Sequence, residues 1–121
     1  MKIAISATGK INESLLDMRF GRCEYFQIHD NESGEVKILE NKGQNSSGGA
    51  GIAASNQLID EKVDVIITGN LGPNAFELIE KAEIKAYKCG NIAISSVLEK
   101  YNDGKLEEIK ISGPAHHGGS H

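Results

Sequence analysis

Two arginines and a cysteine fall within five consecutive residues and form the most chemically suggestive group of this sequence. Arg19 and Arg22 are the only arginines, and Cys23 follows them directly. Guanidinium groups hold anions through fork-shaped donors, whereas thiolates coordinate soft or borderline metals. Together they suit a small anionic metal–sulfur species better than a bare divalent ion, which the arginines would repel.

Glycines and asparagines supply a second set of candidate contacts. Glycine lets backbone amides approach a ligand closely, and helix N-termini carry partial positive charge, so both favour an anion. The glycines could also serve turn geometry alone, and without a following Lys-Ser/Thr they are weak evidence for a nucleotide loop. The predicted cluster-binding residues are Arg19, Gly21, Arg22, Gly48, Gly49, Gly51, Gly69, Asn70, Gly72 and Asn74.

Cysteines and histidines are the candidate metal ligands, and each has a plainer alternative. Cys23 could be only a small residue at the start of a strand, and Cys89 follows an apolar stretch that favours an inert core thiol. A C-terminal tail without a preformed site usually binds metal weakly. His29 is expected to be a solvated strand-end residue. The predicted ligands are Cys23, Cys89, His116, His117 and His121.

The element that must position these groups is the stretch 63–76. Residues 63–68 are apolar and β-branched, as in a parallel strand buried on both faces, and a glycine-rich turn follows. Pro73 is well placed to open a helix. Ligands bind at such strand ends in open α/β sheets.

The remaining segments predict an α/β domain with a mixed five-stranded sheet and three helices. A hairpin followed by two right-handed crossovers gives the strand order 3-2-1-4-5. In that order both cysteines and both arginines would share one edge. We expect a serine to cap the first helix and Asn91 to cap the third. The expected strands are 2–7, 23–29, 35–40, 63–68 and 84–88, and the helices are 52–62, one from residue 73, and one from residue 91 to about residue 101. Residues 105–111 could form one more extended piece, which is not counted in the sheet.

Length and composition indicate one soluble domain. The chain has 121 residues, a net charge of −4 and 39% hydrophobic residues. An acidic balance argues against nucleic-acid and anionic-membrane partners, and no stretch approaches the length of a membrane span. Two cysteines without zinc-like spacing suggest free thiols in the cytoplasm. We expect a single domain over 1–112 and a flexible His/Gly-rich tail over 113–121.

Three segments closely resemble the dinitrogenase iron-molybdenum cofactor biosynthesis family, the relatives of NifX, NafY and the C-terminal domain of NifB. They are Arg19-Phe20-Gly21-Arg22-Cys23-Glu24-Tyr25-Phe26, residues 47–52 and residues 66–76, and the likeness extends to about Gly104. Many members place a histidine directly before the Phe-Gly-Arg, where this chain has Arg19.

That resemblance implies a ribonuclease-H-like fold and a non-enzymatic role in binding or carrying an iron–sulfur or iron–molybdenum-type cluster. A cluster-assembly protein or an ATPase would be a fitting partner. The alternative is a phosphate- or nucleotide-binding regulatory module that uses the glycine turns and Arg22 without metal. A nuclease is disfavoured because two-metal hydrolysis needs clustered carboxylates, and the first strand has none.

Overall fold

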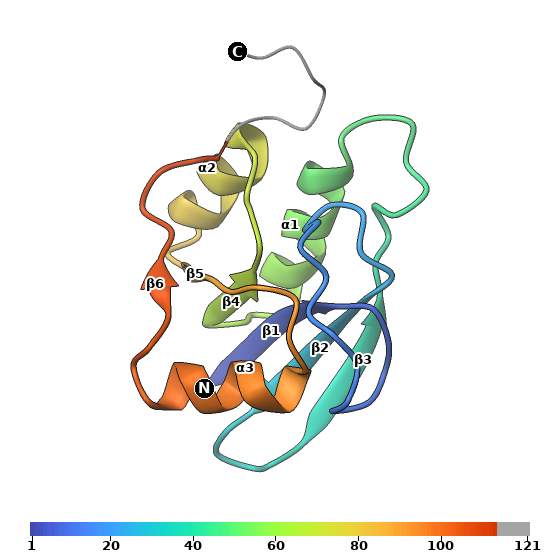
Figure 1. Cartoon of the computed structure of the whole chain (residues 1–121). Coiled ribbons are helices and arrows are strands. Elements are labelled where there is room, and N and C mark those ends of the chain that lie inside the picture. Colours follow the sequence, from blue (N-terminus) through green and yellow to red (C-terminus); the bar gives the residue numbers. More distant parts are fainter. Residues whose placement is uncertain (114–121) are drawn as a thin grey trace.

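A six-stranded mixed sheet forms the centre of the molecule. The computed structural model describes residues 1–113. The strands lie in the order β3-β2-β1-β4-β5-β6, with β1 parallel to β4, β4 parallel to β5, and the other pairs antiparallel (Figure 1). Their bounds are β1 Lys2–Ala7, β2 Tyr25–Asp30, β3 Val36–Glu40, β4 Val65–Thr68, β5 Lys85–Lys88 and β6 Glu107–Glu108.

The predicted order of the first five strands is confirmed, but the predicted number of strands is wrong. The sixth strand, β6, pairs Glu107 and Glu108 with the end of β5. This strand lies within the possible extended piece 105–111, but its two charged residues carry no apolar alternation that would assign it to the sheet. The assignment to a ribonuclease-H-like fold stays a prediction.

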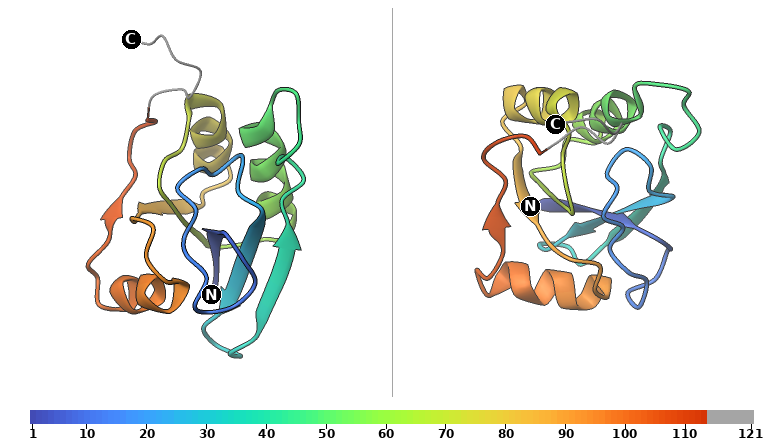
Figure 2. Two further views of the ribbon diagram at one scale, coloured as in Figure 1. Left: turned by 45° about the vertical axis from the view of Figure 1, so that its right-hand side comes forward. Right: turned by 45° about the horizontal axis from the view of Figure 1, so that its top comes forward.

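Helices cover both faces of the sheet in three layers (Figure 2). The helices are α1 Ala50–Asp60, α2 Pro73–Lys81 and α3 Ile94–Asn102. Side chains alternate across β1, so Ala4 packs in the core beneath α1 and α2, while Ile3 and Ile5 pack in the core beneath α3. The sheet therefore separates two apolar cores.

The helix starts differ from the expected capping. Helix α1 begins at Ala50 after Gly49, which has φ 69°, and no side chain caps it. A glycine reaches that left-handed conformation freely, which explains why it takes the cap position rather than a serine. Helix α3 begins after Ala93 rather than after an Asn91 cap.

A long excursion loop, residues 8–24, connects β1 to β2. It is tied to the sheet by Gln27, which is fully buried and donates to the carbonyls of Gly9 and Ile11 at 3.0 and 2.9 Å. His29 lies 2.9 Å from the other end of the same amide and is only 8% exposed. The expectation of a solvated His29 is therefore wrong, because this loop covers that part of β2.

Within residues 1–113, no helix has both the length and the apolar character needed to cross a bilayer.

Candidate anion-binding cavity

A cavity of about 490 Å³ opens where the excursion loop meets the starts of α1 and α2, and we call it the apical cavity. This volume lies within the range of about 300–1,000 Å³ that is usual for ligand pockets. No carboxylate, cysteine or histidine is among the lining residues that the structure describes. The lining consists of Arg19, Phe20, Gly21, Arg22, Gly48, Gly49, Ala50, Gly51, Ile52, Asn70, Gly72, Pro73, Asn74 and Ala75.

Two helix N-termini open into the apical cavity. The first helical hydrogen bonds run from Ala53 N–H to Gly49 and from Phe76 N–H to Gly72, so the amides before them have no partner within their helix. Neither helix has a side-chain cap or an acidic residue in its first turn. Both therefore present partial positive charge to the cavity.

The N-terminus of α3 is built differently. Its amides at Ile94 and Ser95 donate to the carbonyls of Ser14 and Asn12 at 2.9 and 3.1 Å. The excursion loop thus satisfies the start of α3, whereas the starts of α1 and α2 face the cavity. Among residues 1–113, the amides at the starts of α1 and α2 make no backbone hydrogen bond of the kind that holds the start of α3, so they can donate to a guest in the apical cavity.

Arg22 adds a positive charge to the cavity lining. Its Nη1 donates to the carbonyl oxygens of Gln44 at 3.0 Å and Ser46 at 2.6 Å, and it lies 3.5 Å from that of Gly43. These are neutral acceptors, and among residues 1–113 no ion pair to Arg22 meets the 4.0 Å limit for a salt bridge. The side chain therefore holds the loop before α1 in place, and no described carboxylate neutralises its positive charge.

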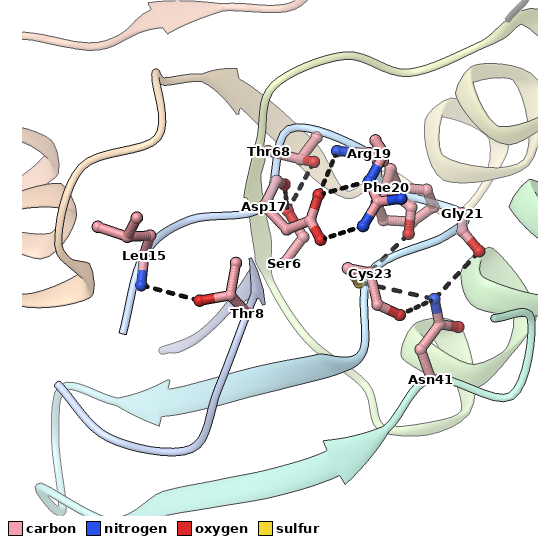
Figure 3. Close-up of polar contacts among 10 residues, drawn as sticks. All are labelled: Ser6, Thr8, Leu15, Asp17, Arg19, Phe20, Gly21, Cys23, Asn41 and Thr68. Atoms are coloured by element: carbon pink, nitrogen blue, oxygen red, sulfur yellow. Dashed lines mark hydrogen bonds and ion pairs between the residues drawn. The ribbon is translucent and has the colours of Figure 1, made fainter. Parts of the chain in front are cut away.

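Arg19, by contrast, has a carboxylate partner (Figure 3). Its Nη2 and Nε lie 2.9 and 3.1 Å from the Asp17 carboxylate, which also accepts the Arg19 backbone N–H at 2.9 Å. Asp17 is only 8% exposed, and this partner raises the pKa of Arg19. This ion pair offsets much of the charge that Arg19 would offer an anion.

Two glycines of the cavity are required by close packing. A Cβ at Gly21 would lie 2.9 Å from the backbone nitrogen of Gly51, and one at Gly51 would lie 3.4 Å from the Ala75 side chain. These contacts bring the excursion loop, α1 and α2 together. At Gly48 and Gly72, in contrast, an added Cβ would meet nothing within 4 Å.

Gly69 is not among the described residues that line the cavity, and its role in cluster binding stays a prediction. A Cβ there would lie 2.7 Å from Cα of Met18, so the glycine allows the excursion loop to pass close to the end of β4. The other nine predicted cluster-binding residues do line it. Five lining residues carried no sequence signal for a site; they are Phe20, Ala50, Ile52, Pro73 and Ala75, and all but Phe20 belong to the first turns of α1 and α2.

Cys23 points into the core beneath α1 and α2 rather than into the cavity (Figure 3). Its thiol is fully buried, donates to the Phe20 carbonyl at 3.5 Å, and lies 3.6 Å from the Asn41 amide nitrogen. Burial raises the pKa of Cys23 to about 12, so the group is a neutral thiol at physiological pH. A metal ligand must be the thiolate, which this environment disfavours.

The two cysteines lie at the expected edge of the sheet, Cys23 just before β2 and Cys89 just after β5, but their thiols pack into different cores. Cys89 belongs to the other core, beneath α3, and burial also raises the pKa of its thiol. Within residues 1–113, no group of three or more His, Cys, Asp and Glu side chains could hold a metal ion. A ligand role for either thiol stays a prediction that would require the sulfur to become exposed. His116, His117 and His121 lie outside the described residues.

Comparison with known proteins now identifies the family. The profile of the dinitrogenase iron-molybdenum cofactor family matches residues 1–104. The chain belongs to this family. The protein MJ0580 of Methanocaldococcus jannaschii is 34% identical over 113 residues, which cover 91% of this chain and 92% of the relative.

Solved structures resemble this member of the dinitrogenase iron-molybdenum cofactor family along nearly their whole length. The apo form of the orange protein from Desulfovibrio gigas is 29% identical with a TM-score of 0.88, covering 93% of this chain and 95% of that one. A Thermotoga protein, TM1290, provisionally described as a NifB protein, is 32% identical with a TM-score of 0.81, covering 97% and 98%. The description of the family names the iron-molybdenum cofactor of dinitrogenase.

Proposed function

We propose that this chain binds and carries an anionic iron–sulfur or iron–molybdenum-type cluster in the apical cavity, without catalysing a reaction on it. The observation that carries the proposal is the lining itself, in which two uncapped helix N-termini and Arg22 converge with no described carboxylate. Such a surface stabilises a negative guest by donors and dipoles already in place.

The residues that line the cavity are suited to hydrogen-bonding the outer sulfides of a cluster rather than to coordinating its metal atoms. Sulfide ligands on the surface of a cluster carry negative charge and accept hydrogen bonds from N–H groups. Amides at the starts of α1 and α2 and the Arg22 guanidinium are such donors. Holding a cluster by its outer sulfides leaves it able to depart, as a carrier requires. A cluster-assembly protein or an ATPase is the kind of partner that could load or receive such a guest.

The test of this proposal is anaerobic reconstitution with Fe²⁺, sulfide and molybdate, followed by desalting and elemental analysis. We expect the wild-type protein to retain metal and to absorb visible light. Gly72→Leu should retain much less, because its Cβ enters open space within the cavity. Gly90→Leu is the matched control, since a Cβ there also meets nothing within 4 Å and Gly90 does not line the cavity. Colourless, metal-free wild-type protein would overturn the proposal.

A phosphate or nucleotide is the second candidate guest, favoured by the same two helix N-termini beside Arg22. Phosphate groups also bind at such positions. Thermal unfolding with ATP, cyclic nucleotides and inorganic phosphate separates the two functions. A rise in Tm with a nucleotide, combined with no metal retained in the reconstitution, would favour the regulatory module over the cluster carrier.

A further inference from the structure

We propose that Asn41 is a positioning residue of the apical cavity, which sets the place of the Arg22 guanidinium without touching the guest. This inference rests on the proposed function and deepens it, because it names the side chain that holds the cavity's positive charge in position. Asn41 is only 5% exposed and is not among the described lining residues, so it acts on a guest through its neighbours.

The amide nitrogen of Asn41 holds the backbone on both sides of Arg22. Nδ2 donates to the carbonyl oxygen of Gly21 at 3.1 Å and to that of Cys23 at 2.9 Å (Figure 3). An amide NH₂ group has two hydrogens to donate, and each has a carbonyl partner here. Arg22 thus lies between two tethered carbonyls, and its backbone cannot shift without breaking one of these bonds.

The amide oxygen of Asn41 holds the loop that accepts the Arg22 side chain. Oδ1 accepts the backbone N–H of Gly43 at 2.9 Å, which forms an Asx-turn. The carbonyl oxygens of Gln44 and Ser46, which follow in this loop, are the close acceptors of Arg22 Nη1. Asn41 therefore fixes both the backbone from which Arg22 extends and the loop on which its guanidinium rests.

Both of the segments that Asn41 ties together pack against the start of α1. A Cβ at Gly21 would lie 2.9 Å from the backbone nitrogen of Gly51, and one at Gly43 would collide with the carbonyl oxygen of Ala50. Neither segment has room for a larger residue at these contacts. The amide of Asn41 thus links the excursion loop to the first turn of α1, whose N–H groups face the cavity.

The backbone bonds of Asn41 do not depend on its side chain. Its N–H donates to the carbonyl of Glu24 at 3.0 Å, and its carbonyl accepts the N–H of Gln44 at 3.2 Å. Both bonds remain available after substitution. A change of side chain therefore removes the ties to the excursion loop and leaves the β2–β3 hairpin paired.

Asn41→Ser is the test variant, because a serine hydroxyl can form the corresponding turn with the Gly43 N–H but is too short to replace Nδ2. Asn41→Thr removes the same two donors and repeats the comparison in a second variant. Gln57→Ala is the matched control. Gln57 accepts the N–H of Lys42 at 3.1 Å and donates to the carbonyl of Glu40 at 2.8 Å, so it ties the residues on either side of Asn41 to α1.

The assay is an anaerobic calorimetric titration of the full-length proteins with the molybdenum–sulfur anion tetrathiomolybdate. Each variant is made both in the wild-type chain and in Arg22→Met. In the wild-type chain, Asn41→Ser should lower the affinity about five- to thirtyfold, within the range of couplings measured in one hydrogen-bond network. In the Arg22→Met chain, the same change should alter the affinity by less than about twofold, because the group that Asn41 positions is already absent.

An equal loss of affinity in both chains would overturn the inference, because Asn41 would then act independently of Arg22. Unchanged affinity in Asn41→Ser and Asn41→Thr, or an equal loss in Gln57→Ala, would also overturn it. Each of these results would leave the proposed function intact. Wild-type protein that does not bind tetrathiomolybdate would instead count against the proposed function, and the inference would fall with it.

Discussion

Replacing Arg22 by methionine tests whether the apical cavity holds an anion by charge. Arg22→Met removes the guanidinium but keeps an unbranched side chain that can pack along the same path. The Arg22 side chain meets only backbone carbonyls among the described residues, so its charge is available to a guest. The loss should therefore directly weaken binding of tetrathiomolybdate, a dianion whose molybdenum already has four sulfide ligands.

The size of the effect follows from the kind of bond that is lost. A hydrogen bond to a charged group contributes about 1.5–3 kcal/mol. Because about 1.4 kcal/mol corresponds to a factor of ten, the affinity for tetrathiomolybdate should fall roughly 10- to 150-fold. The carbonyls of Gln44 and Ser46 also lose their donor, so a modest fall in Tm is expected in addition.

The assay is an anaerobic calorimetric titration with tetrathiomolybdate at fixed ionic strength. Lys105→Met is the matched control, because it removes the same charge from an exposed residue outside the cavity lining. Unchanged affinity in folded Arg22→Met would refute the assignment of Arg22 to the site. Equal weakening by both variants would show that net charge, not the cavity, governs binding.

Three further outcomes concern the groups around the cavity and the sheet. Burial raises the pKa of Cys23 to about 12, so mass spectrometry after iodoacetamide treatment at pH 8 should find Cys23 unmodified in folded protein, and rapid labelling would contradict its placement. Burial lowers the pKa of His29, so the unfolded chain binds its proton more readily and the free energy of unfolding should fall as pH drops below about 6.5. Urea unfolding at pH 7 and pH 5 checks this, and a pH dependence unchanged in His29→Gln would argue against it. Arg19→Met should lower the free energy of unfolding by about 1–2 kcal/mol, because it leaves the Asp17 carboxylate with fewer partners. This value lies between the typical losses on breaking an exposed and a buried salt bridge. Asp17→Asn combined with Arg19→Met should recover part of that loss in the same urea experiment, and no recovery would contradict the pairing.

Much of the fold could be predicted because the main elements carry strong local signals. The apolar run of β4, the glycine turn after it and Pro73 at the start of α2 each agree with the tertiary structure. Strand order followed from the hairpin and the handedness of crossovers. Strand β6 and the helix caps were less accessible, because they depend on contacts with distant segments such as the excursion loop.

The candidate site was predictable in its backbone and less so in its side chains. Glycine-rich turns and helix starts have recognisable sequence patterns, and nine of the ten predicted cluster-binding residues line the cavity. The direction of the Cys23 side chain could not be predicted, because a residue just before a strand can face either the edge of the sheet or the core. Asn41 and the Phe20 carbonyl, both outside any local pattern, hold its thiol in the core.

The position of a bound guest is the measurement that tests the account most directly. Crystals of the full chain grown anaerobically with tetrathiomolybdate can be examined by anomalous diffraction at the molybdenum edge. The account predicts one strong peak in the apical cavity, between Arg22 and the N-termini of α1 and α2. A peak beside Cys89, at another surface, or no peak in crystals that contain molybdenum would contradict it.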